Sequence, residues 1–168
     1  RFYGSFSNRG GGLNLALESP GFSLGKYSFN NINLNALIRE KDWTINLLGD
    51  KYLYDDSAII ENISLNQLGS YGASNYVLNW ESPDSIKFEG GLKGLVNMDN
   101  TSLKVVLDEG QFYFADTLWT LKDSSYFNYF NGKINSQASL STVSQDVSFS
   151  FISNGITNNP VIFFDNVS

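Results

Sequence analysis

Two pairs of neighbouring carboxylates are the side chains of this sequence best suited to chemistry. Asp55-Asp56 and Asp108-Glu109 each bring two acids together, as glycosidases and calcium sites do. Both pairs lie where the apolar pattern breaks, so we expect turns, in which acidic residues are ordinary. Neither pair has the Asp-x-Asp-x-Asp-Gly spacing of a calcium loop. We therefore predict no catalytic residue and no metal site at these pairs.

A glycine-rich segment, Glu89-Gly90-Gly91-Leu92-Lys93-Gly94, resembles the loops that hold phosphate groups. Such a loop needs a helix directly after it and a Gly-x-Gly or Gly-Lys-Ser/Thr spacing, and this segment has neither. We interpret it as a strand in which glycines replace larger side chains.

The 168 residues include no Cys and no His. Disulfides, thiol nucleophiles, zinc-finger ligand sets and the usual proton shuttle at neutral pH are therefore missing. The net charge of -6 disfavours binding to nucleic acid. We predict that the chain is not an enzyme, needs no cofactor and does not bind nucleic acid.

The elements that would position any site are strands. From Ser102 to Leu121, β-branched and aromatic residues alternate with polar ones, and similar segments recur at intervals of roughly 8 to 14 residues, as in all-β proteins. We predict an all-β fold: a curled antiparallel or parallel sheet that forms a β-taco-like groove, with a β-sandwich as the alternative. Residues 1–168 are expected to form a single β-rich segment of a longer protein.

Several breaks in the pattern predict local features. Ser19-Pro20-Gly21 predicts a turn between two short strands, and Asp108-Glu109-Gly110 predicts a turn between two others. Asn30-Asn31 predicts a β-bulge or a tight corner, because the apolar parity changes there. The segment 35–40 looks briefly helical, but alternation resumes at Trp43, so we predict no helix.

Three tryptophans, Trp43, Trp80 and Trp119, are candidates for a platform on which sugar rings stack. Each has Leu or Ile two residues away, which favours packing within an apolar sheet face or groove. The apolar face is expected to be lined by residues of one parity: Leu13, Leu15, Leu17, Ile32, Leu34, Trp43, Ile45, Leu47, Leu78, Trp80, Phe88, Leu103, Val105, Leu107, Trp119, Leu121, Phe149 and Phe151.

The second half of the chain has a hydrophobic strand, a Gly-bearing turn and a Trp-containing strand in series. The segments concerned are Tyr76-Val-Leu-Asn-Trp80, 86–98, 103–114 with Trp119-Thr-Leu121, Asn131-Gly-Lys-Ile134, Ser139-Leu140, Val147-Ser-Phe-Ser-Phe151 and Phe163-Phe-Asp-Asn-Val167. Through these segments, residues 75 to 168 resemble the TamB family, the translocation and assembly module related to AsmA-like proteins, in its Bacteroidetes-type form.

This resemblance implies a segment of the β-rich periplasmic region of an envelope-spanning protein, anchored to the inner membrane through a segment outside this chain. It implies an apolar groove that carries phospholipid acyl chains to the outer membrane, supports outer-membrane protein assembly, or does both. It also implies a TamA-type outer-membrane barrel as a partner.

An alternative function is a carbohydrate-binding or adhesin-type β-sandwich at the cell surface, for which Tyr71, Tyr126 and Tyr129 are candidate contacts. A sugar site more naturally places aromatic residues in loops, whereas all three tryptophans fall in predicted strands. The two functions differ in one structural feature, which is whether the apolar face is open or is covered by a second sheet.

Overall fold

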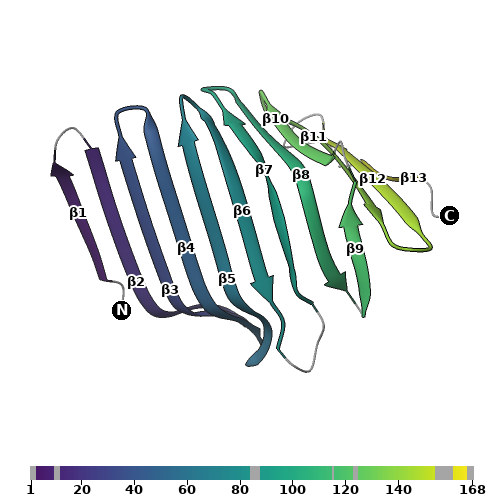
Figure 1. The fold of residues 1–168 in the computed structure, drawn as a ribbon, viewed down its shortest axis with the longest axis horizontal. Helices are drawn as coiled ribbons and strands as arrows, with labels where there is room; N and C mark the ends of the chain where they lie inside the picture. Colours follow the sequence, from purple (N-terminus) through teal and green to yellow (C-terminus); the bar gives the residue numbers. More distant parts are fainter. Residues whose placement is uncertain are drawn as a thin grey trace.

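The computed structural model describes residues 3–9, 12–83, 88–114, 116–122, 125–153 and 161–165, with the backbone alone described for 3–9 and 161–165. The described residues form thirteen strands in one sheet (Figure 1). The strands are β1 (Tyr3–Arg9), β2 (Gly12–Leu24), β3 (Tyr27–Arg39), β4 (Asp42–Tyr54), β5 (Ser57–Ser70), β6 (Ala73–Glu81), β7 (Gly90–Met98), β8 (Ser102–Phe114), β9 (Thr117–Leu121), β10 (Ser125–Phe130), β11 (Lys133–Ser141), β12 (Asp146–Ser153) and β13 (Val161–Asp165).

The strands follow one another in chain order, and every pairing is antiparallel. Only β9 leaves this order, because it pairs with the end of β8 on one side and with two residues of β11 on the other. No described segment is helical, so the all-β prediction is confirmed, as is the absence of a helix at 35–40. The choice left open between antiparallel and parallel pairing is settled as antiparallel.

Tight turns join neighbouring strands and use backbone conformations that match the twist of a hairpin. Asp55 and Asp56, between β4 and β5, have φ angles of 52° and 65°. Tyr71 and Gly72, and Asn131 and Gly132, also have two positive φ angles in sequence. Two positive φ angles characterise type I′ turns, which suit right-twisted strands. The prediction of a turn at Asp55-Asp56 is confirmed.

The predicted turn at Asp108-Glu109-Gly110 is wrong, because β8 runs without a break through these residues. The register against β7 shifts there: Lys93 pairs with Glu109, while Gly94 pairs with Leu107. One extra residue in β8 therefore forms a β-bulge, which breaks the alternation in the sequence just as a turn does.

The predicted turn at Ser19-Pro20-Gly21 is also wrong, since β2 continues from Gly12 to Leu24. These residues lie at a corner where the strands bend together. The ladder of paired residues is interrupted at Pro20 in β2, near Asn31 in β3 and at Asp50 in β4. Asn31 also has a positive φ of 48°. The lower ends of β2 to β5 bend across the bottom of the molecule (Figure 1). The prediction of a corner at Asn30-Asn31 is confirmed.

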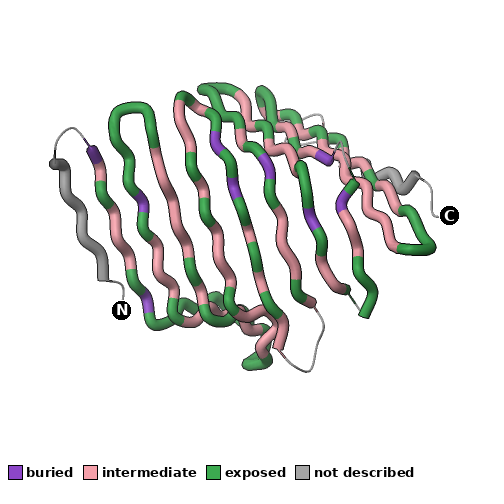
Figure 2. Tube along the Cα trace, viewed as in Figure 1, coloured by how far each residue is buried: buried purple, intermediate pink, exposed green. Residues whose placement is uncertain are grey.

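The sheet is a single layer. Among the described residues, substantial contacts join only strands that are hydrogen-bonded neighbours, and few side chains are buried (Figure 2). A compact 18.7 kDa monomer exposes about 8,300 Å², whereas this chain exposes 11321 Å². The alternative of a β-sandwich is wrong, because the described strands form one sheet with no second sheet against it.

Candidate functional site

The register of the strands places the predicted apolar residues on one face of the sheet. Residues paired across antiparallel strands point to the same side, and so do residues two apart along one strand. Above the corner in β2 to β5, this rule can be followed from Leu17 to Leu34 and Leu47, and onward to Phe149 and Phe151 in β12. All the predicted lining residues that lie in strands fall on this side, which we call the leucine face.

Phe88 precedes β7, and its ring lies 6.1 Å from that of Trp80, so it belongs to the same face. Within the described strands, no residue assigned to the leucine face carries a charge. The role of these residues in binding lipid stays a prediction.

A row of leucines crosses this face at right angles to the strands. Each member pairs with the next: Leu17 with Leu34, Leu34 with Leu47, and Leu47 with Leu65. The pairing continues through Leu65 with Leu78, Leu78 with Leu92, Leu92 with Gly110, Leu121 with Leu140, and Leu140 with Val147. Gly110 and Leu121 lie side by side in the row, because a Cβ at position 110 would be 3.4 Å from the Leu121 Cβ. We call these ten residues the leucine row.

Glycines on this face make room for neighbouring side chains. A Cβ on Gly69 would collide with the Trp43 ring, and a Cβ on Gly110 would collide with Leu92. The Tyr76 hydroxyl lies 3.1 Å from the position of a Cβ on Gly94. Large side chains therefore lie flat over the backbone of the next strand, which shields part of their surface without a second sheet.

Several polar groups on the leucine face are bonded within the protein. Gln67 donates a hydrogen bond of 2.6 Å to the Ser74 hydroxyl, and the fully buried Ser125 hydroxyl accepts from the Ser139 amide at 3.1 Å. Tyr76 is 9% exposed and makes a long contact of 3.5 Å to the Val106 carbonyl. Burial, with a smaller effect from Asp108, raises the pKa of this phenol, so it is neutral at pH 7. The face thus presents little polarity to a ligand.

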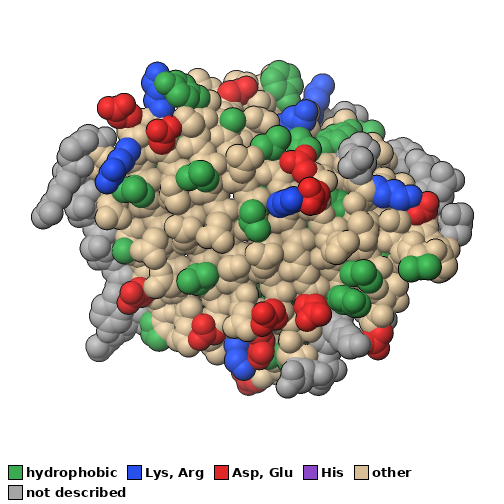
Figure 3. Space-filling model, viewed as in Figure 1, with side chains coloured by type: hydrophobic (Ala, Val, Ile, Leu, Met, Phe, Trp, Pro, Cys, Tyr) green, Lys and Arg blue, Asp and Glu red, His purple; other side chains and the backbone are tan. Residues whose placement is uncertain are grey.

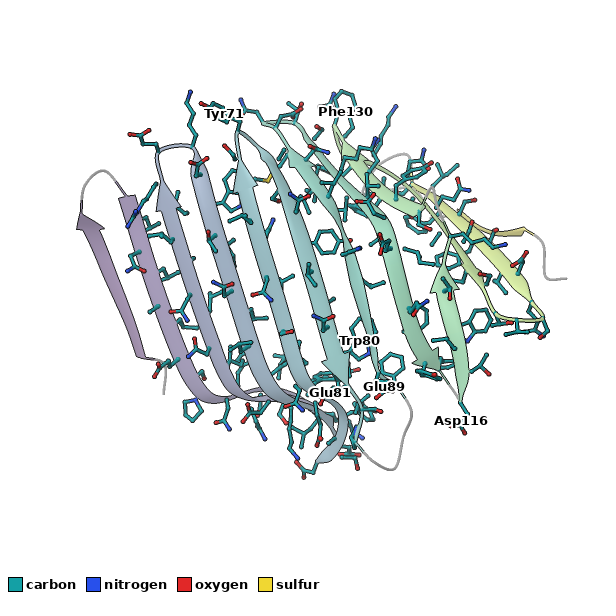
Figure 4. The ribbon with its side chains drawn as sticks, viewed as in Figure 1. Tyr71, Trp80, Glu81, Glu89, Asp116 and Phe130 are labelled. Atoms are coloured by element: carbon teal, nitrogen blue, oxygen red, sulfur yellow. The ribbon has the colours of Figure 1, made fainter. Side chains whose placement is uncertain are left out.

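Aromatic rings gather at the lower end of this face, where Figure 4 labels Trp80 at the end of β6. Its ring centre is 6.1 Å from Phe88 and 6.5 Å from Phe112, and Phe88 is 6.2 Å from Phe114. The Trp80 Nε1 is buried and has no hydrogen-bond partner among the described residues.

The opposite face, which we call the polar face, carries Asn, Ser and charged side chains with scattered apolar ones. Isolated apolar residues stand out from it: Leu48 is 53% exposed and Leu68 is 64% exposed. Figure 3 shows the side of the molecule on which hydrophobic side chains are isolated among polar ones, as expected for this face. Members of the leucine row on β2 to β7 are instead half-buried, because they contact one another.

The three candidate tyrosines do not form one site. Tyr71 lies in the turn between β5 and β6 and is 76% exposed, with the Lys41 ammonium 4.4 Å from its ring centre. Tyr126 and Tyr129 lie on opposite faces of β10, because they are three residues apart in one strand. The sugar contact predicted for these residues therefore has no common surface.

The paired acids are placed separately. Asp55 forms an exposed ion pair of 3.1 Å with Lys26, and Glu109 forms one of 2.6 Å with Lys93. In the described ranges, no three Asp or Glu side chains come together as a metal ligand set. No helix in those ranges is long and apolar enough to cross a membrane.

Sequence reasoning missed part of the row. The members that were not among the predicted lining residues are Leu65, Leu92, Gly110, Leu140 and Val147. The sequence feature that could have predicted the row is a leucine at a similar number of residues from the turn on both strands of each successive hairpin. Leu92 was obscured by the glycines around it, and Leu65 by the bulges in β5.

No protein-family model, curated protein or solved structure matches this chain. The resemblance to the TamB family stays a prediction.

Proposed function

We propose that the leucine face binds the acyl chains of phospholipids, and that the chain is a segment of a periplasmic protein that carries lipid towards the outer membrane. The observation that carries the proposal is the leucine row, which crosses the sheet without a charged residue and without a covering layer. Monomeric proteins rarely leave such an extended apolar surface open to water.

The dimensions of the row fit this role. Ten strands at a spacing of about 4.8 Å give a row of about 40 Å. One acyl chain spans half of a hydrocarbon core about 30 Å thick. The row is therefore longer than a single acyl chain, as expected of a track along which lipids move rather than of a pocket for one molecule.

The surroundings of the row support a ligand that is apolar along its whole length. An acyl chain offers no hydrogen bonds, and two polar side chains near the row, Gln67 and Ser74, already bond to each other. The resemblance to the TamB family adds the expected location, the inner-membrane anchor, a TamA-type barrel partner and support of outer-membrane protein assembly.

The test is photo-crosslinking in cells with the full-length protein. A photoreactive amino acid is placed at Leu78, Val105 or Phe149 on the leucine face, or at Asn79 on the polar face as the control. We expect phospholipid adducts at the first three positions and background at Asn79. Equal adduct at all four positions would refute the proposal.

A second measurement uses the same variants. After crosslinking, adducts with a TamA-type barrel are detected by mass, which tests the partner separately from the lipid. Lipid adducts without barrel adducts would support the leucine face as a lipid site and would refute the barrel as a partner.

A further inference from the structure

The polar face is hollowed beside β7 and β8. A cavity of about 690 Å³ opens there, within the size range of small-molecule sites. Most of its lining residues, from β6, β7, β8 and β9, have side chains on the polar face, while Leu92, Gly110, Phe112 and Leu121 of the leucine face also contribute to the lining. The lining side chains on the polar face include Asn79, Lys93, Glu109, Gln111, Tyr113 and Leu118. Glu89, labelled in Figure 4, is one of the lining residues.

Glycine and the β8 bulge create the hollow. A Cβ on Gly91 would lie 2.7 Å from the Asn79 Oδ1 atom, so any larger residue would fill the space that now lies beside the amide. At the bulge, Lys93 pairs with Glu109 and the register then shifts. The floor of the hollow is therefore backbone, and side chains form only its rim.

The rim carries hydrogen-bonding groups that the protein does not use. Among the described residues, no hydrogen bond is made by the side-chain amides of Asn79 and Gln111 or by the Tyr113 hydroxyl. Val77 and Leu118, which are 41% and 39% exposed, add apolar surface beside them. Unused amides next to apolar surface suit a ligand with hydroxyl groups on one side and C–H groups on the other.

The charged side chains that line the hollow limit the class of ligand that it can bind. Lys93 is held 2.6 Å from Glu109, so its charge is compensated. Glu89 and Asp108 add two further carboxylates to the lining, which makes the hollow acidic and repels phosphates and carboxylates. Carboxylate oxygens and amide oxygens accept hydrogen bonds, as the hydroxyl groups of a sugar require.

We propose that this hollow binds a neutral saccharide, with Asn79 and Gln111 bonding its hydroxyl groups and the Tyr113 and Leu118 side chains contacting its C–H surface. The four side chains proposed to contact the saccharide lie on the polar face, opposite the leucine row. The saccharide site therefore does not rest on the proposed lipid function, and either can fail without the other.

Binding is tested by titration calorimetry with four neutral probes, cellohexaose, maltohexaose, xylohexaose and mannohexaose, and with spermidine as a cationic probe. Gly91→Val fills the hollow, and the double variant Asn79→Ala/Gln111→Ala removes the amides without changing the backbone. Asn75→Ala, on the same face of β6 but outside the lining, is the matched control.

We expect at least one hexasaccharide to bind, with an affinity that falls tenfold or more in Gly91→Val and in the double variant and is unchanged in Asn75→Ala. Circular dichroism of each variant confirms that it is folded, and the double variant at exposed positions keeps the test valid should Gly91→Val misfold. The proposal is overturned by no binding of any hexasaccharide, by binding that survives the double variant, or by binding of spermidine alone.

Discussion

Leu92 of β7 lies across Gly110 of β8, in the space that a side chain at position 110 would occupy. The Leu92 side chain therefore fills the row's position on β8, the strand of the row whose residue, Gly110, has no side chain. On the far side, Leu121 of β9 lies close to the same glycine. The row is therefore continuous because residue 110 is small.

Gly110→Val is expected to destabilise the protein by about 1 to 3 kcal/mol, because the new methyl groups collide with Leu92 in a site that is already filled. Gly49→Ala on the same face is the control, since its Cβ meets only the Ile63 Cβ at 4.0 Å. Urea unfolding followed by circular dichroism measures both. Equal stability of the two variants would show that residue 110 is not tightly packed.

The fold class and the composition of the apolar face were predictable from the sequence, because alternation has a period of two and each strand had one consistently apolar parity. From Leu13 to Phe151, that parity falls on one face. The number of layers was not predictable, because a face covered by a second sheet and an open face have the same alternation. Only the pairing pattern of the strands distinguishes them.

Two leucines of β5 provide a test of which face is structured. Leu65→Ala is expected to cost about 1 to 3 kcal/mol, below the range for fully buried leucines because Leu65 is only half-buried. Leu68→Ala, at a position that is 64% exposed on the polar face, is expected to stay within about 0.5 kcal/mol of the parent protein. Chemical unfolding of both variants gives the comparison. A larger loss in Leu68→Ala would contradict the assignment of the faces.

At the corner, Asn31 adopts a φ of 48°, and its side-chain amide donates a hydrogen bond of 2.6 Å to Asp50. Asn31→Val is expected to lower the melting temperature, since β-branched residues rarely adopt positive φ. Asn31→Gly should lose less, because glycine tolerates this conformation although the bond to Asp50 is lost. Thermal melts of the two variants decide, and a greater loss in the glycine variant would show that the hydrogen bond outweighs the backbone conformation.

The errors in the sequence analysis at Pro20 and at Asp108 have one physical origin. A kink within a strand and a turn between strands interrupt alternation in the same way, and both favour Pro, Gly, Asp and Asn. The sequence pattern alone does not show whether the chain reverses. The pairing with a neighbouring strand shows whether the chain reverses, and β7 pairs with β8 on both sides of the bulge, so β8 does not reverse there.

Asp99 predicts a pH dependence in the loop between β7 and β8. Hydrogen bonds from the Thr101 amide, and then from the Ser102 hydroxyl and amide, lower the pKa of this carboxyl from 3.8 to about 2. Because the folded pKa lies below the unfolded one, the carboxylate stabilises the fold above pH 3.8, and this contribution is lost as the pH falls towards 2. Asp99→Asn should remove that part of the acid dependence of the urea midpoint. An unchanged pH profile in the variant would contradict the assignment.

The last prediction separates lipid binding from folding by placing a carboxylate on each face in turn. Leu78→Asp sets an acid in the leucine row, where a charge next to an acyl chain costs several kcal/mol, and it should abolish binding of a phospholipid with a fluorescent acyl chain. Leu95→Asp, on the polar face of the neighbouring strand and 38% exposed in the parent protein, should leave binding intact.

Measuring lipid binding at lower pH shows whether Leu78→Asp has simply unfolded the sheet. Burial against lipid raises the pKa of the introduced carboxyl above its ordinary value of about 3.9, so the group becomes neutral at mildly acidic pH. Lipid binding by Leu78→Asp should then recover as the pH falls from 7 towards about 5, while binding by the parent protein stays constant. Recovery requires a folded sheet, because an unfolded chain has no apolar face to restore. Undiminished lipid binding by Leu78→Asp at pH 7 would show that Leu78 does not contact the acyl chain, and equal loss in Leu95→Asp would show that the leucine face is not the lipid site.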